Sequence, residues 1–154
     1  MKYSLMPIRT KADIRDNFRD NPIGRLLEYH NLGIGAKEYD NAELLICMCM
    51  DNRKKLSIPD NFAFILRSGG ANLSRMDFKA SFAIAIGGVR AICLICHDNC
   101  RMVNLRSQKT KFIEGMQKVG WNAETASKHF DENVKSFEIG DAIDFVVNES
   151  LRLK

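Results

Sequence analysis

Residues 43–53 of the chain read ELLICMCMDNR, an almost unbroken apolar run that ends abruptly in polar and charged residues. An apolar run this short is typical of a β-strand that is covered on both faces, as in a parallel sheet. Two further runs have the same character, NFAFIL over residues 61–66 and AICLIC over residues 91–96. The three runs together predict the strands of one small parallel sheet.

Helical patterns separate and flank these runs. The apolar stripe Phe78, Phe82, Ala85 and Ile86 predicts a helix over residues 77–87, which two glycines end. Further helices are expected over residues 11–19, 22–31, 112–119, 123–135 and 139–151. Strands that alternate with helices predict an α/β fold: a small, mostly parallel β-sheet flanked by helices, with right-handed crossovers and helical N- and C-terminal segments.

Two of these predicted helices begin or end at residues that are typical of helix ends. Pro22 is expected in the first turn of the 22–31 helix, and Gly33 is expected to end it. Asn122 is expected to cap the helix that follows it.

The composition is that of one ordinary domain. The chain has 154 residues, of which 45% are hydrophobic and 27% are charged, so we expect a single domain over residues 1–154. Its apolar runs fall short of the roughly 18 residues of a membrane span, and its first residues lack the apolar stretch of a secretion signal. We therefore expect a cytoplasmic protein without membrane contact. The net charge of +4 is scattered among acidic residues, which argues against a nucleic-acid partner.

Five cysteines are the unusual feature of the composition. An odd count without a secretion signal argues against a disulfide framework and for reduced thiols that are available to metal or redox chemistry. Cys47 and Cys93 lie inside apolar runs, where we expect small core residues. Cys93 and Cys96 have the Cys-x-x-Cys spacing of a redox-active cysteine pair, but within a strand their thiols would point to opposite faces. Cys96 adjoins His97 and is expected near the edge of any site there.

Chemically reactive side chains follow two of the three runs. Cys49, Asp51 and Arg53 come at the end of the first run, and His97 and Cys100 come directly after the third. Ligands of open parallel sheets bind outside the carboxyl ends of the strands, so these side chains meet if the two strands are neighbours. Thiolates, imidazole and carboxylate are the groups that hold Zn²⁺ in a tetrahedron. The sequence therefore predicts a zinc site at this edge of the sheet.

Asp51 and Arg53 distinguish a catalytic metal site from a structural one. A structural zinc ion is closed by four protein ligands, whereas the Asp51 carboxylate can either bind the metal or turn to the Arg53 guanidinium. When the carboxylate turns away, the fourth position opens to water, whose pKa zinc lowers toward ~7. Asp51 and Arg53 are therefore candidate catalytic residues. The alternative is an ordinary ion pair at the end of a strand.

The residues after the second run form a third candidate element. They are Arg67, Ser68, Gly69, Gly70 and Ala71. Paired glycines allow a positive φ and close backbone approach, so free amides here could line a small anionic pocket. The stretch lacks the Gly-Lys-Ser/Thr ending of a phosphate-binding loop. A substrate pocket and a simple tight turn stay as alternatives.

These stretches, in this order, resemble the β-class carbonic anhydrases. That family carries Cys-x-Asp-x-Arg after its first strand, an Arg-Asn-Ala-Gly-type turn after the second and His-x-x-Cys after the third. Here the three motifs read CMDNR over residues 49–53, RSGGA over residues 67–71 and HDNC over residues 97–100. The resemblance covers about residues 40–101.

The resemblance implies a zinc ion held by Cys49, His97, Cys100 and, exchangeably, Asp51, whose partner is Arg53. It implies the reversible hydration of CO2 to bicarbonate: zinc-bound hydroxide attacks carbon, bicarbonate leaves, and water reloads the metal. It also implies a β-carbonic-anhydrase-like fold.

Family members are homodimers or higher homo-oligomers, so the resemblance implies the same assembly, with residues 1–32 as a helical arm that contacts the partner. Cys96 and Arg101 stand where the family usually has glycines, and they put bulk and charge next to the site. Two alternatives therefore stay open. One is a hydrolase of a related small molecule such as COS or CS2, and the other is a zinc-binding family member without catalytic activity.

Overall fold

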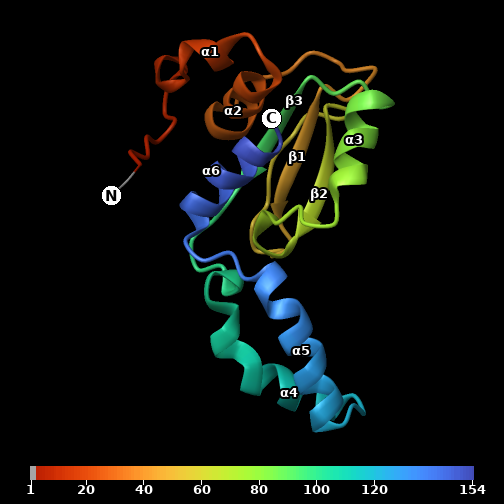
Figure 1. Ribbon diagram of the computed structural model, residues 1–154. Helices are drawn as coiled ribbons and strands as arrows, with labels where there is room; N and C mark the ends of the chain where they lie inside the picture. The colour runs from red at the N-terminus through yellow and green to blue at the C-terminus, as the bar shows by residue number, and fades with distance from the viewer. Residues whose placement is uncertain (1–2) are drawn as a thin grey trace.

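A computed structural model describes residues 3–154 and shows a mixed α/β fold (Figure 1). The strands of this part of the chain are β1 (Leu44–Cys49), β2 (Ala63–Ser68) and β3 (Ala91–Ile95). The α-helices are α1 (Asp16–Arg19), α2 (Pro22–Leu32), α3 (Asp77–Ala85), α4 (Lys109–Lys118), α5 (Ala123–Phe137) and α6 (Ala142–Arg152). Three 3₁₀ helices are η1 (Lys11–Asp13), η2 (Gly69–Ala71) and η3 (Arg101–Gln108). None of the helices in residues 3–154 has both the length and the apolar content needed to cross a membrane.

β1 lies at the centre of a three-stranded parallel sheet, with β2 along one side and β3 along the other. Cys47 of β1 is level with Leu66 of β2 and with Leu94 of β3. All six residues of β1 are buried, which confirms the prediction of a strand covered on both faces. Because the strand order reverses between β1 and β3, the loops that follow these two strands are neighbours at one edge of the sheet.

Alternate residues of β1 fill two separate hydrophobic cores, as the two-residue period of a strand requires. On one face, Ile46 belongs to a cluster that includes Leu26 of α2. On the other face, Cys47 belongs to a cluster that includes Ala80 and Ala83 of α3. Figure 1 shows α2 and α3 on opposite sides of the strands.

The single helix predicted over residues 11–19 is wrong. The chain forms η1 and α1 there, and Ile14 between them is extended, with φ −78° and ψ 118°. The Asp13 carboxylate accepts hydrogen bonds from the backbone amides of Arg9 and Thr10, at 2.9 and 2.7 Å. These hydrogen bonds belong to a capping box at the start of η1, and the extended backbone of Ile14 then ends this short helix.

The expected helix ends are confirmed. α2 begins with Pro22 and is followed by Gly33 in the left-handed conformation, with φ 66°. The Asn122 side chain caps α5 by accepting a hydrogen bond of 2.7 Å from the amide three residues later. α6 begins three residues later than predicted, because the Asp141 side chain caps its first turn.

β2 departs from the prediction in its position and its burial. The strand starts two residues later than the apolar run and includes Arg67 and Ser68, which were expected to follow it. It is an edge strand, so it is not covered on both faces as predicted, and Phe64 and Ile65 are exposed. A hydrophobic run of this length does not by itself distinguish a central strand from an edge strand.

α3 forms where predicted, but its apolar stripe faces solvent. The helix packs on the sheet through Ala80 and Ala83, and it leaves Phe78, Phe82 and Ile86 exposed. The small alanine side chains let the helix backbone approach the sheet closely, so the larger side chains lie on the outer side. The stripe expected to face the core is therefore an exposed apolar surface.

α4 and α5 form a helical hairpin, with the rings of Phe112 and Phe130 in contact at a centroid distance of 5.2 Å. Figure 1 shows the hairpin extending beyond the carboxyl ends of the strands. η3 links β3 to this hairpin, so the hairpin lies next to the sheet edge at which the predicted site residues gather.

Glu43, which precedes β1, forms ion pairs with α2 and with two connecting segments of the chain. Its carboxylate accepts hydrogen bonds from Arg25 of α2, from Arg90 at 2.8 Å and from Lys37 at 3.3 Å. Burial raises the pKa of Glu43, but the hydrogen bonds from Arg90, Arg25 and Lys37 outweigh it, so the pKa lies below its ordinary value of 4.5. A lowered pKa stabilises the fold above pH 4.5, and this stabilisation is lost as the pH falls through the pKa of the folded state.

Glu43→Gln is therefore expected to lower the free energy of unfolding at pH 7 by about 1–3 kcal/mol. It should also reduce the loss of stability between pH 5 and pH 3, since the variant has no carboxylate to protonate at this position. Urea unfolding at a series of pH values measures both effects. Glu114→Gln, on the exposed surface of α4, is the control. If Glu43→Gln lost as much stability between pH 5 and pH 3 as the wild type does, protonation of Glu43 would not be the cause of that loss.

Candidate metal centre

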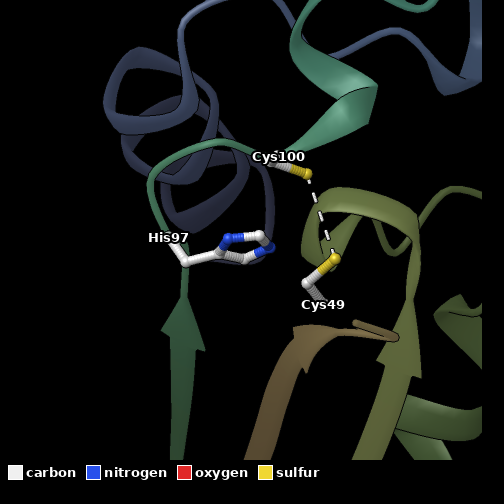
Figure 2. A group of neighbouring side chains, drawn as sticks. All are labelled: Cys49, His97 and Cys100. Carbon is white, nitrogen blue, oxygen red and sulfur yellow. Dashed lines mark hydrogen bonds between the residues drawn. The ribbon is translucent and has the colours of Figure 1, made fainter. Parts of the chain in front are cut away.

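Two loops at the carboxyl edge of the sheet bring three potential metal ligands together. Cys49 is the last residue of β1, and His97 and Cys100 lie in the loop after β3. Their ligand atoms all lie within 4.8 Å of one another (Figure 2). These three residues could hold a metal ion, as the sequence indicated.

The separation of the two sulfur atoms fits a shared metal ion. Sγ of Cys49 lies 3.9 Å from Sγ of Cys100, far longer than the roughly 2.05 Å of a disulfide bond. Two thiolates at about 2.3 Å from one tetrahedral zinc ion lie about 3.8 Å apart. The two sulfurs are therefore spaced as ligands of one ion of this size.

His97 presents one ring nitrogen to the two thiols. Nδ1 lies 2.6 Å from the carbonyl oxygen of Asp98, and because a carbonyl only accepts, Nδ1 carries the proton in this contact. Nε2 is buried and has no hydrogen-bond partner among residues 3–154. Figure 2 shows the ring edge turned toward the sulfurs. A hydrogen bond from the second ring nitrogen is the usual support of a metal-binding histidine.

The surroundings of Cys49 distinguish its thiol from that of Cys100 and from that of the core residue Cys93. Burial acts to raise the pKa of Cys49, but hydrogen bonds from the backbone amides of Asp51 and Gly70, together with the nearby His97 side chain, outweigh it and lower the pKa. Burial raises the pKa of Cys100, and the neighbouring Cys49 raises it further. Burial alone raises the pKa of Cys93 to about 11. One sulfur of the pair is thus favoured as a thiolate, the form that binds metals.

The Asp51 carboxylate is held by Arg53 and is not part of the three-residue group. Nε of Arg53 donates to Oδ1 and Oδ2 of Asp51 at 2.9 and 3.0 Å, and the Arg53 amide donates to Oδ1 at 3.0 Å. These hydrogen bonds hold the pKa of Asp51 far below its usual range. The carboxylate is therefore ionised and points to the guanidinium, which is one of the two positions that the sequence predicted for it.

The five residues predicted as a substrate pocket have different roles. Only Gly69 lines the cleft described below. Arg67 donates from its guanidinium to the carbonyl oxygens of Cys49 and Lys54, at 3.1 and 3.2 Å, and so holds the loop after β1. The Gly70 amide donates to Sγ of Cys49 at 3.4 Å. Ser68 donates to a backbone carbonyl of the same turn, and Ala71 is buried with φ 62°.

A cleft of about 850 Å³ opens beside the three ligands. Asp51 and Arg53 line it from the loop after β1, Gly69 lines it from η2, and η3 and the α4–α5 hairpin supply its other wall. Residues of that wall that the sequence did not single out as site residues are Met102, Leu105, Gln108, Lys111, Phe112 and Phe130. Arg101 also lines the cleft. The position of this wall depends on how the α4–α5 hairpin packs beside the sheet edge, and no local sequence pattern predicts this packing.

Gly70 supports the site through its backbone conformation. Its φ of 66° is left-handed, and a Cβ added there would lie 2.7 Å from Cδ1 of the buried Ile139. We expect Gly70→Ala to lower the free energy of unfolding by about 1–3 kcal/mol, from the backbone strain and the contact. Urea unfolding measures this. Gly115→Ala is the control, because a Cβ there meets open space and should stabilise α4 by about 0.5–1 kcal/mol. Equal stability of the two variants would contradict the expectation.

Comparison of the sequence with models of known protein families and with curated proteins gives no match. The functional interpretation therefore rests on the chemistry of the site and on the order of its motifs. Fold alone does not specify a function, so the geometry around the three ligands carries the argument.

Proposed function

We propose that Cys49, His97 and Cys100 hold a catalytic zinc ion and that the protein catalyses the reversible hydration of CO2 to bicarbonate. The observation that carries this proposal is a group of three metal-ligand residues beside a broad cleft. A structural zinc site has four protein ligands, whereas a catalytic site has three and keeps one position open.

The donor set favours zinc among the common metals. Two thiolates and one imidazole are soft and borderline ligands, which suit zinc and exclude calcium and magnesium, since those ions take oxygen ligands. The sulfur separation of 3.9 Å and the unpartnered Nε2 of His97 fit such an ion. When bound with an open position, zinc lowers the pKa of a coordinated water to about 7 and so supplies a nucleophile at neutral pH.

Asp51 and Arg53 are assigned to the positioning of the water that reacts with CO2. Arg53 holds the Asp51 carboxylate on the wall of the cleft through its side chain and its amide. An ionised carboxylate only accepts hydrogen bonds, so Asp51 would orient the reacting water by accepting a hydrogen bond from it. Because Arg53 donates to both carboxylate oxygens, it holds Asp51 outside the three-residue ligand group.

The remaining wall suits an apolar substrate and an anionic product. Met50 and Met102 offer apolar surface to CO2, and Arg101 and Lys111 place positive charge in the same cleft for bicarbonate. The resemblance to β-class carbonic anhydrases supports the assignment, since all three of its motifs contribute to this edge of the sheet. On the same grounds we propose a β-carbonic-anhydrase-like fold.

The test is a stopped-flow assay of CO2 hydration with a pH indicator, on protein with one zinc ion per chain. The expected result is a rate well above that of buffer and proportional to protein concentration. A rate equal to buffer would overturn the proposal for CO2. In that case, consumption of COS or CS2 by the same protein would establish the hydrolase alternative, and inactivity toward all three with zinc retained would establish a zinc-binding protein without this catalysis.

A further inference from the structure

Cys49 and Cys100 are the one pair of cysteines in residues 3–154 whose sulfur atoms are in hydrogen-bond contact. The two Sγ atoms lie 3.9 Å apart, and both residues line the cleft beside the candidate metal centre (Figure 2). The core cysteines Cys47 and Cys93 do not line this cleft. A small oxidant that enters the cleft therefore meets Cys49 and Cys100 together.

The backbone around the two sulfurs holds one of them and leaves the other on a turn. Cys49 ends the central strand, and the Arg67 guanidinium donates to its carbonyl oxygen at 3.1 Å. Cys100 follows an exposed turn of Asp98 and Asn99, in which Asn99 is left-handed with φ 53°. A disulfide bond is about 2.05 Å long, so the sulfurs must approach each other by about 1.9 Å. A rotamer change with a small shift of the turn supplies this distance.

A metal ion and a disulfide bond exclude each other at these two sulfurs. Two thiolates on one tetrahedral zinc ion lie about 3.8 Å apart, whereas two bonded sulfurs lie about 2.05 Å apart. The thiolate is also the form of cysteine that binds a metal, and a disulfide bond removes it from both residues. The pair therefore has two alternative states, a reduced one that is spaced for a metal ion and an oxidised one that is closed to it.

We propose that Cys49 and Cys100 form a reversible disulfide bond when a hydroperoxide oxidises the metal-free chain, and that this bond prevents the site from taking up zinc. The proposal rests on the same two ligands as the proposed function, but the oxidation needs neither a bound metal nor activity toward CO2. It concerns one reversible bond at the site and not a disulfide framework, against which the odd number of cysteines argues.

The oxidation consumes one molecule of hydrogen peroxide per chain. The first sulfur attacks the O–O bond of the peroxide, which leaves a sulfenic acid on the cysteine and releases one water. The second sulfur attacks the sulfenic sulfur, so the S–S bond forms and a second water leaves. Two thiols thus lose two electrons and two protons, and the peroxide is reduced to two waters. A dithiol reductant restores both thiols by exchange and becomes a cyclic disulfide itself.

The test is a count of free thiols in the full chain after treatment with a small excess of hydrogen peroxide. The metal-free protein is expected to lose two of its five free thiols, and peptide mapping by mass spectrometry should find a cross-link between Cys49 and Cys100. A dithiol reductant should restore all five. Free zinc at about 100 times its Kd leaves about 1% of the chains metal-free, so the cross-link should then form about 100-fold more slowly. The cross-linked chain should take up no zinc until it is reduced.

Cys96→Ser is the matched control, because Cys96 is a partly buried free thiol outside the contact pair. This variant should form the same cross-link, whereas Cys100→Ser should form no internal disulfide, and circular dichroism checks that both fold. The peptide map of the wild-type chain decides the pairing without any variant.

A metal-free chain that keeps all five thiols would overturn the proposal. So would a wild-type cross-link that includes Cys96, or a cross-linked chain that still takes up zinc. Formation of the Cys49–Cys100 cross-link in a chain whose zinc-loaded form does not hydrate CO2 would support the oxidation and contradict only the proposed activity.

Discussion

Cys49→Ser is expected to reduce zinc affinity by more than about 100-fold, since loss of a group that merely supports a zinc ligand already costs 10–100-fold. Serine has nearly the shape of cysteine, but its hydroxyl is a poor ligand at neutral pH. The wild-type chain should retain one zinc ion after dialysis, and the variant close to none. Elemental analysis gives the zinc content, and competition with a chromophoric chelator gives the affinity. CO2 hydration should fall with the zinc content.

Cys96→Ser is the matched control for this loss. Cys96 immediately precedes His97, is partly buried and is a free thiol, yet it lies outside the three-residue group. Its substitution should leave one zinc ion per chain. Cobalt substitution adds a spectroscopic test, since thiolate ligands give a sulfur-to-metal charge-transfer band that Cys49→Ser should weaken and Cys96→Ser should not. Equal zinc loss in both variants would indicate general unfolding, and full zinc retention by Cys49→Ser would contradict the assignment of this ligand.

The positions of Cys49, His97 and Cys100 could be predicted because each lies at or just after the end of an apolar strand. A parallel sheet brings strand ends to one edge, so sequence position alone placed these side chains together once β1 and β3 were neighbours. Both ends of α2 and the start of α5 could be predicted for a similar reason. Pro22, Gly33 and Asn122 act on backbone groups within one turn, so their effect depends only on the local sequence.

The features that the sequence did not predict depend on contacts between distant segments. The apolar spacing of Phe78, Phe82 and Ile86 correctly indicated a helix, but not which side of that helix would face the sheet. Ala80 and Ala83 took that position because their small side chains permit close packing. Likewise, Phe112 and Phe130 reach the cleft only because α4 and α5 fold back beside it.

Asp51→Ala is expected to lower the rate of CO2 hydration by about 100-fold, the lower end of what a positioned proton-accepting group contributes. Zinc content should stay at one per chain, because Cys49, His97 and Cys100 remain. The reason is that the variant loses the acceptor that we propose orients the reacting water, while the three candidate metal ligands are untouched. Stopped-flow rates and elemental analysis on the same samples separate these two effects. A loss of zinc that parallels the loss of rate would instead assign Asp51 as a permanent fourth ligand.

Arg53→Gln should cause a comparable loss, because it releases the carboxylate that three hydrogen bonds from the Arg53 side chain now hold. The double variant Asp51→Ala/Arg53→Gln should be no slower than Asp51→Ala, since Arg53 acts through Asp51 and the two effects do not add. Lys54 and Asp98 provide a matched pair: they form an ion pair of 2.9 Å at the same sheet edge, but neither lines the cleft. Substituting that pair by Gln and Asn should leave the rate within about twofold, the scale of an exposed ion pair. If the rate losses of Asp51→Ala and Arg53→Gln added in the double variant, Arg53 would not act through Asp51. If the Lys54 and Asp98 variant lost as much rate as Asp51→Ala, a general change in surface charge, and not the Asp51 carboxylate, would set the rate.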